Sequence, residues 1–282
     1  MALRTRHVLL ALLASTTLAV APSGGADAQT ILPTDARFVL GVRAGIQAFN
    51  YQEHIGNTDS DYDSVGPAIG VTGSLKLIDR LRLNVDYLGS YIQEDTETWN
   101  NIGTFAGFTV NQQNDMDVSF HVFDVDVSYS LVKTPQVEWA VALGWHYYAE
   151  DFTRRNFRFL VSTLTLFSPI GPVSEDVRGQ GVKIGTTVGF RPTPNLLIGG
   201  GLAWYGLYDV EADNSVLGTV ESDGYALRLR ATVDYAINAM VTVGLGYEGH
   251  YISIEQGQSA IAILPRNETM AHTFTAAVRL RF

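Results

Sequence analysis

Cysteine is absent from this 282-residue sequence, and its long apolar runs are confined to the first thirty residues. Without cysteine the chain has neither disulfides nor thiolate chemistry. No later segment is long and apolar enough to be a transmembrane helix. Basic residues are also few, since 19 lysines and arginines stand against 29 aspartates and glutamates, a formal net charge of −10. This balance argues against nucleic acid as a partner.

The start of the chain has the layout of an export signal. Two arginines precede an apolar run at 8–21, and the small-x-small sequence ADA follows at 26–28. The run is short for a bilayer span, and small and polar residues come after it. We therefore predict a cleaved signal peptide at 1–28 and one mature domain at 29–282. No cysteine follows the cleavage site, which excludes a lipoprotein anchor there.

The mature domain consists of alternating apolar and polar residues, the period of a β-strand. Short breaks between the segments alternate with long, polar ones, which is typical of an up-and-down meander. An open sheet of this size would expose two edges, and closure into a barrel removes both. We predict about ten strands (8–12 possible) near 36–53, 62–77, 80–95, 115–131, 136–151, 176–191, 195–210, 222–237, 239–254 and 269–282.

The composition of the two strand faces indicates which side of the barrel is wet. In 225–235 one face is apolar and ends in tyrosines at both ends, while the other carries Arg228, Arg230 and Asp234. A soluble barrel would place its apolar face inward. Small and charged residues on the opposite face, with aromatics near the ends of the apolar one, favour a lipid-facing belt with aromatic girdles. The fold class is therefore all-β, a transmembrane antiparallel β-barrel.

The chain ends on the alternating segment HTFTAAVRLRF, with Val278, Leu280 and Phe282 on its apolar face. Together with the signal peptide, the strands and the loop pattern, this ending resembles the Gram-negative outer-membrane β-barrel superfamily over the whole mature chain. The resemblance implies that these three residues form the signal read by the barrel-assembly machinery. It also implies location in the outer membrane and contact with its lipid and lipopolysaccharide, and it points to no particular subfamily.

Charged residues on the inner faces are the candidate lumen or constriction residues. Both signs occur in similar numbers, so opposite charges are expected to pair across a narrow lumen. One interpretation is an ion-pair network that fills and stiffens the barrel; the alternative is the charged constriction of a small-solute channel. The residues are Arg43, Lys76, Arg82, Asp86, Asp124, Asp126, Glu138, Lys183, Arg191, Arg228, Arg230, Asp234, Glu248, Arg279 and Arg281.

An enzyme would need a catalytic cluster at the rim, as in the ten-stranded omptin proteases. Glu248 with His250, and His146 with Glu150, are the nearest approach to one. Such pairs are more often hydrogen bonds inside a lumen, and the paired-aspartate and Asp-His signatures of omptins are not found at matching places. The sequence also lacks GxSxG, HExxH and a phosphate loop. We therefore expect no catalytic residues, no cofactor and no enzyme activity, with an omptin-like protease as the least favoured alternative.

Two of the long loops invite closer examination. Asn57, Asp59, Asp61 and Asp63 alternate as in a calcium loop, but the glycine and the twelfth-position glutamate of that motif are missing, so a solvated acidic loop is favoured and no metal site is predicted. The longest loop, 153–172, opens with three arginines that could contact lipopolysaccharide phosphates. An extension of its hairpin above the membrane is favoured over a plug.

These observations predict a monomeric outer-membrane barrel with both termini in the periplasm and five extracellular loops. Its narrow charged lumen and acidic loops favour a structural or surface-interaction role. The alternative is a cation-preferring porin for small solutes or ions, because an acidic mouth concentrates cations.

Overall fold

The computed structural model describes residues 36–216, 218–258 and 263–282. The predicted signal peptide at 1–28 lies outside these residues. The described part of the chain contains strands and turns, and no helix in it is long and apolar enough to cross a membrane.

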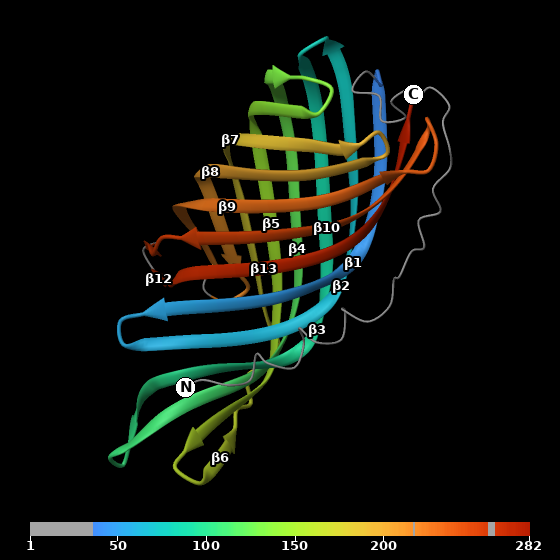
Figure 1. Ribbon diagram of the computed structural model, residues 1–282. Coiled ribbons are helices and arrows are strands. Elements are labelled where there is room, and N and C mark those ends of the chain that lie inside the picture. The colour runs from blue at the N-terminus through green and yellow to red at the C-terminus, as the bar shows by residue number, and fades with distance from the viewer. Residues whose placement is uncertain (1–35, 217, 259–262) are drawn as a thin grey trace.

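Ten long antiparallel strands form a closed ring (Figure 1), which confirms the predicted fold class and strand number. In chain order the ring strands are β1 (Phe38–Ile55), β2 (Thr58–Ile78), β3 (Leu81–Phe105), β4 (Phe108–Lys133), β5 (Val137–Val161), β7 (Val173–Thr193), β8 (Leu196–Asn214), β9 (Gly218–Ala236), β10 (Val241–Ile254) and β13 (Arg266–Arg281). Each pairs with its neighbours in the ring, and the pairing of β4 with β5 completes the circle.

The first and last strands close against each other. β1 pairs with β13 along nearly its whole length, from Val39 opposite Arg281 to His54 opposite Arg266. At the end of the seam the Phe282 amide donates to the Phe38 carbonyl, and the two rings stack with centroids 6.1 Å apart. The terminal aromatic is therefore part of the barrel wall, which explains why the chain ends on an apolar strand.

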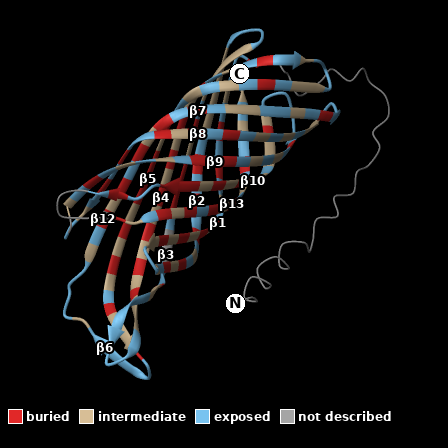
Figure 2. Ribbon diagram, turned by 90° about the vertical axis from the view of Figure 1, so that its left-hand side faces the viewer, coloured by how far each residue is buried: buried red, intermediate tan, exposed pale blue. Residues whose placement is uncertain are grey.

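Buried and exposed residues alternate along the strands, as Figure 2 shows. On β5 the outward residues Trp139, Val141, Leu143, Trp145 and Tyr147 are apolar or aromatic, and Asp151, Thr153 and Arg155 follow them on the same face. Large apolar side chains are likewise exposed on the outer face of the other ring strands, among them Ile69, Leu229, Leu245 and Leu280. We call this outward band the apolar belt. Its height on β5 matches the 9–11 residues that a strand needs to cross a bilayer.

The two ends of the barrel differ. At the short-turn end, which contains Phe38 and Phe282, brief turns join β2 to β3, β4 to β5, β7 to β8 and β9 to β10, as predicted. At the other end, here called the extended end, the strands continue far beyond the apolar belt. β4 has 26 residues, about 85 Å of extended chain.

The loops at the extended end are therefore shorter than predicted, and the strands are longer. The segment 96–114, expected to be a loop, forms the outer halves of β3 and β4, joined by a tight turn at Ala106 and Gly107, both with positive φ. Asparagines and glycines made this segment look irregular, but Asn101 adopts a left-handed conformation within the strand, which asparagine tolerates. The outer halves of these strands have no apolar outer face, but they still pair because the backbone hydrogen bonds between strands do not require one.

The segment after Arg154 extends β5, as favoured over a plug. β5 runs to Val161 and turns at Ser162 into β6 (Leu164–Phe167), which pairs back onto it. In Figure 1 this hairpin stands apart from the ring at the extended end. Two further short strands, β11 (Gly257–Gln258) and β12 (Ile263–Leu264), pair with each other between β10 and β13.

Candidate functional site

The predicted lumen residues lie on the inner strand faces. Strand alternation puts each on the side of the buried residues of its own strand, and nine of the fifteen are at least nine-tenths buried: Arg43, Asp86, Asp124, Asp126, Lys183, Arg191, Arg228, Asp234 and Glu248. The structure brings most of them into contact. Their role as a seal or a constriction stays a prediction.

A network of ion pairs crosses the lumen at the level of the apolar belt. Arg43 on β1 contacts Asp86 on β3 and Glu248 on β10 at 2.6 and 2.7 Å. Arg230 on β9 contacts the same two carboxylates, at 2.6 and 2.7 Å. β9 and β10 are neighbouring strands, but β3 and β9 lie on opposite sides of the ring, so the pair formed by Arg230 and Asp86 crosses the lumen.

Arg228 joins this group to a second one on β4 and β7. Its guanidinium contacts Asp86 at 2.9 Å, Glu248 at 2.7 Å and Asp124 on β4 at 2.6 Å. Lys183 on β7 in turn contacts Asp124 at 2.8 Å and Asp126 at 2.6 Å. We call these eight residues the central network. Four cations face four carboxylates in it, so its charges balance.

Both histidines of the possible catalytic pairs belong to this region and are buried. Nε2 of His250 lies 2.6 Å from Glu248. Nδ1 of His146 lies 2.6 Å from Asp124 rather than beside Glu150, and the Tyr205 ring packs 4.0 Å from the imidazole. Each histidine thus makes a hydrogen bond inside the lumen, as favoured, and neither is exposed at a rim.

A layer of aromatic and aliphatic side chains covers the central network toward the extended end. Phe49 packs edge-on against Phe120 and Tyr62, and Tyr51 packs on Phe152 with ring centroids 4.6 Å apart. The fully buried members of this layer are Phe49, Tyr51, Tyr62, Leu88, Met116, Phe120, Tyr148, Phe152, Tyr205, Ile252 and Ile254. This layer was not predicted, because the strands were expected to end near it.

Glu150 lies beside this layer and beyond the apolar belt, level with the outward residues Asp151 and Arg178. It is fully buried, and burial raises the pKa of its carboxyl to about 8. The Thr269 hydroxyl on β13 partly offsets this rise in the pKa. At neutral pH this side chain is therefore mostly a neutral acid inside the barrel.

A second buried charge cluster lies above the aromatic layer, again outside the belt. Arg154 on β5 contacts Glu53, Glu97 and Glu175 at 2.9, 2.8 and 2.6 Å. Tyr51 donates a hydrogen bond to Glu53, and Asn114 donates one to Glu97 at 2.9 Å. We call Arg154 and its three glutamates the upper cluster.

The charges of the upper cluster are unequal. Burial, helped by the neighbouring glutamates, raises the pKa of Glu53 to about 8 against the attraction of Arg154. Burial alone would lower the pKa of Arg154, but the three glutamates outweigh it and hold this pKa well above its usual range. The expected surface cluster of arginines is therefore wrong for Arg154, which points inward. The sequence pattern that could have predicted this direction is the inward series of residues 148, 150 and 152, which continues to Arg154 in the segment expected to be a loop.

Smaller groups line the lumen toward the short-turn end. Arg279 pairs with Asp234, and Arg281 lies on the same inner face of β13. Arg191 lies 3.7 Å from Glu138. Lys76 lies 3.5 Å from Asp79, and Arg82 donates to Ser74 at 3.5 Å. These predicted residues are thus placed along the axis but outside the central network.

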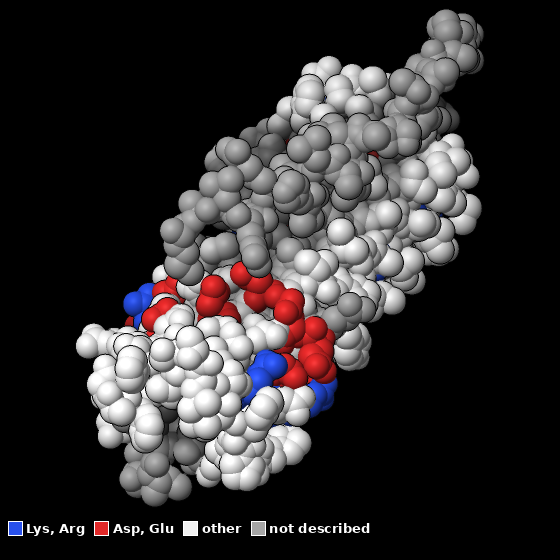
Figure 3. All heavy atoms as spheres, turned by 90° about the horizontal axis from the view of Figure 1, so that it is seen from below, with Lys and Arg blue, Asp and Glu red and all other residues white. Residues whose placement is uncertain are grey.

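The outer surface of the extended end is acidic. Figure 3 looks onto this end and shows aspartates and glutamates gathered on it, with few basic side chains. Asp61 and Asp63 belong to β2 rather than to a loop, and both accept hydrogen bonds from Asn50. Within the described residues no three histidine, aspartate or glutamate side chains are arranged to hold a metal ion.

Comparison with known proteins identifies the fold. No family model matches the chain, and no curated protein matches its sequence. Among solved structures, the outer membrane protease OmpT from Escherichia coli is similar with a TM-score of 0.72 at 12% identity, covering 87% of this chain and 96% of that one. Neisserial surface protein A gives a TM-score of 0.35 at 12% identity, covering 88% and 98% of the two chains. The attachment invasion locus protein of Yersinia pestis gives 0.33 at 8%, covering 86% and 97%.

Proposed function

We propose that this chain, which has the β-barrel fold of Gram-negative outer-membrane proteins, is a sealed outer-membrane barrel with a structural or surface-interaction role. The predicted signal peptide supports export, and the exposed side chains of the apolar belt support contact with lipid and lipopolysaccharide. Both termini would face the periplasm, and the extended end would stand outside the cell. We propose that the barrel is monomeric.

The main support for a sealed barrel is the contact between Arg228 and Asp124 across the lumen. Charges held 2.6 Å apart by partners on non-neighbouring strands occupy the lumen at that level, which supports a sealed barrel. The aromatic layer and the upper cluster add two more barriers on the same axis. Three successive layers argue against the alternative of a small-solute channel.

Protease activity is not favoured by the resemblance in fold to OmpT. At 12% identity this likeness speaks for the barrel alone. His146 and His250 are nearly fully buried beneath the aromatic layer, where a polypeptide substrate has no access. We therefore propose that the barrel carries no hydrolytic site.

Conductance of the refolded protein in planar bilayers tests the sealed barrel. We expect no stable conductance steps at a salt concentration of about 1 M. Stable, cation-selective steps would contradict the proposal and favour the channel. Placement of the extended end outside the cell is tested separately by inserting an epitope tag after Gly107 and staining intact cells, with a tag after Pro194 as the control that should remain unlabelled.

A further inference from the structure

The hairpin formed by the end of β5 and β6 presents an unpaired strand edge. β6 pairs with β5 through Val161 opposite Leu164 and Arg158 opposite Phe167, and no other strand in the described part of the chain pairs with it. The Ser168 amide continues this ladder by donating to the Phe157 carbonyl at 2.9 Å. Because alternate residues of a strand face the same neighbour, Thr165 and Phe167 direct their amides and carbonyls to the open edge.

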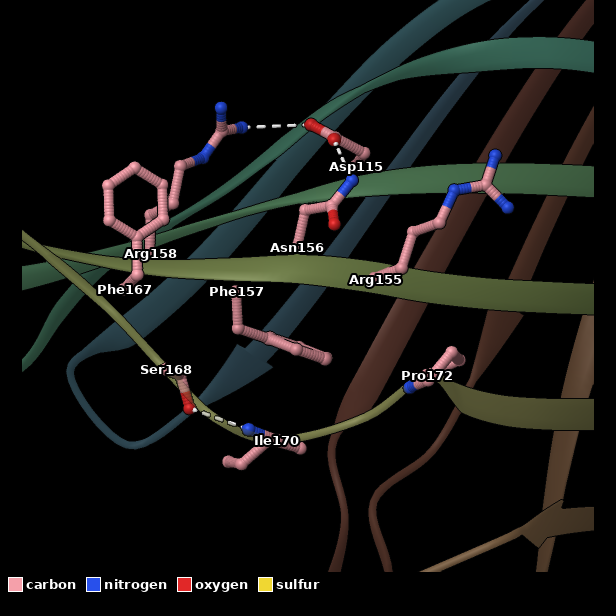
Figure 4. A pocket seen from close by; sticks show the side chains of 9 residues that line it. All are labelled: Asp115, Arg155, Asn156, Phe157, Arg158, Phe167, Ser168, Ile170 and Pro172. Atoms are coloured by element: carbon pink, nitrogen blue, oxygen red, sulfur yellow. Dashed lines mark hydrogen bonds and ion pairs between the residues drawn. The ribbon is translucent and has the colours of Figure 1, made fainter.

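A cavity of about 440 Å³ lies beside this hairpin, between β5 and the start of β7. Figure 4 shows Phe157 pointing into it, with Ile170 and Pro172 on the returning chain. The opposite wall is polar, where Asp115 accepts hydrogen bonds from Arg158 and Asn156 at 2.9 and 2.8 Å. One side of the cavity is thus suited to an apolar side chain and the other to a polar backbone.

Phe157 is buried, but other apolar residues of the hairpin and the returning chain are exposed. Phe167 has 77% of its surface exposed, and Leu164 and Ile170 have 53% and 55%. Lipid does not explain this exposure, because about 35 Å of strand separates Arg158, the partner of Phe167, from Tyr147 at the edge of the apolar belt. Unpaired edges with exposed apolar residues attract another chain unless they are protected.

Charge distinguishes between the possible chains. The exposed surface of β2 to β5 at the extended end carries eight carboxylates against two arginines, both already paired with carboxylates. The carboxylates are Asp59, Asp61, Asp63, Glu94, Asp95, Asp115, Asp117 and Asp151. A second copy of this chain, with a net charge of −10, would be repelled. A basic partner would be attracted.

We infer that β6 binds an extended, basic polypeptide segment of another protein by strand addition, an inference that rests on the proposed surface-interaction role. The segment pairs with the free amides and carbonyls of Thr165 and Phe167. Its alternate apolar side chains pack on Phe167 and into the cavity lined by Phe157 and Ile170, while its lysines or arginines face the acidic surface. Backbone pairing supplies affinity, and the cavity and the charges supply selectivity.

The test uses the full mature chain in nanodiscs and a fluorescein-labelled eight-residue peptide in which lysine alternates with valine. We expect saturable binding by fluorescence anisotropy that weakens as salt increases. A peptide of the same composition with its lysines and valines in two blocks, and one with glutamate in place of lysine, should bind at least tenfold more weakly. Empty nanodiscs give the lipid background.

Two substitutions locate the site. T165P removes an amide from the open edge without removing a bond to β5 and should weaken binding of the alternating peptide at least tenfold. F167N should weaken it at least threefold by opening the cavity wall. V216S, at an exposed valine on another hairpin (68% exposed), is the matched control and should bind as the unmodified chain does. All three variants should keep the resistance to unfolding of the unmodified barrel.

Several outcomes would overturn the inference. If the block peptide bound as tightly as the alternating peptide, the acidic surface would be attracting any cation. If T165P and F167N bound the alternating peptide as tightly as the unmodified chain does, the contact would lie elsewhere. Dimers that disappear in T165P would show that the occupant is a second copy. Failure of the inference is distinguishable from failure of the proposed function: a conducting barrel that binds the peptide contradicts only the sealed lumen, and a silent barrel that does not bind it contradicts only the site on β6.

Discussion

Arg228 on β9 and Asp124 on β4 meet across the barrel, with Nη1 and Oδ2 2.6 Å apart. The two strands are not neighbours in the ring, so this ion pair lies across the lumen. The contact therefore brings two buried charges from separate parts of the wall together inside the lumen. The same contact ties β9 and β4 together.

The central network is expected to contribute strongly to stability. R228M removes one cation from among three buried carboxylates, and breaking a buried pair from one side costs about 3–5 kcal/mol. The free energy of unfolding of the refolded barrel in urea measures this loss. R82M, at a lumen arginine that is only half-buried, should cost less than about 1 kcal/mol. Equal effects of the two substitutions would contradict the special position of Arg228.

The upper cluster should respond to substitution in a pH-dependent manner. R154M leaves Glu53, Glu97 and Glu175 buried together without a cation, so a loss of about 3–5 kcal/mol is expected at pH 7.5. The loss should shrink near pH 5, where Glu53 is fully protonated because burial raises its pKa to about 8. R155M changes an exposed neighbour (37% exposed side chain) and should have little effect at either pH. A loss that is the same at both pH values would show that repulsion among the glutamates is not the cause.

Glu150 gives a second pH dependence, of known sign. Its pKa in the folded barrel is raised to about 8 from an ordinary value near 4.5. Between these two values the folded state holds a proton that the unfolded state has released, so this group's stabilisation is full below pH 4.5 and is lost as the pH rises toward 8. The slope is at most about 1.4 kcal/mol per pH unit. Glu53, whose pKa burial also raises to about 8, contributes in the same direction.

E150Q should remove the contribution of Glu150. Unfolding of the variant between pH 4.5 and 9 should show a shallower decline than unfolding of the unmodified barrel, with the largest gain above pH 8. D151N, at an outward-facing neighbour on the same strand, serves as the control and should leave the decline in place. A parallel shift of the whole curve by E150Q would indicate a packing effect instead of proton linkage.

The terminal aromatic should matter more for assembly than for stability. Phe282 is 59% exposed and contacts mainly Phe38, while the closing hydrogen bonds use its backbone. F282A is therefore expected to lower the stability of the refolded barrel by only about 1 kcal/mol. The amount of barrel that reaches the outer membrane in cells should fall much more, because the resemblance implies that the assembly machinery reads this residue. F38A removes the same ring contact without changing the terminus, and it should leave assembly near normal.

Much of the fold was predictable because strand alternation is a local property. A period of two in 225–235 places Leu227 and Leu229 outward and Arg228 and Arg230 inward whatever the partner strands are. Short turns such as that between β2 and β3 were also predictable. The ends of the strands were not, because residues such as Asn101 and Gly107 favour a loop by propensity, while pairing with a neighbour extends the strand.

The candidate site was predictable only as a set of residues. The sequence by itself determined that charge lines the interior, that apolar side chains face outward and that the last strand ends in the barrel wall. Which carboxylate meets which arginine was decided by the tertiary structure alone, since Arg228 and Asp124 are far apart in the chain and meet through the order and stagger of ten strands. The same holds for Arg154, whose three glutamates come from three other strands. Contacts across a lumen depend on the curvature of the whole ring, and no local pattern encodes that curvature.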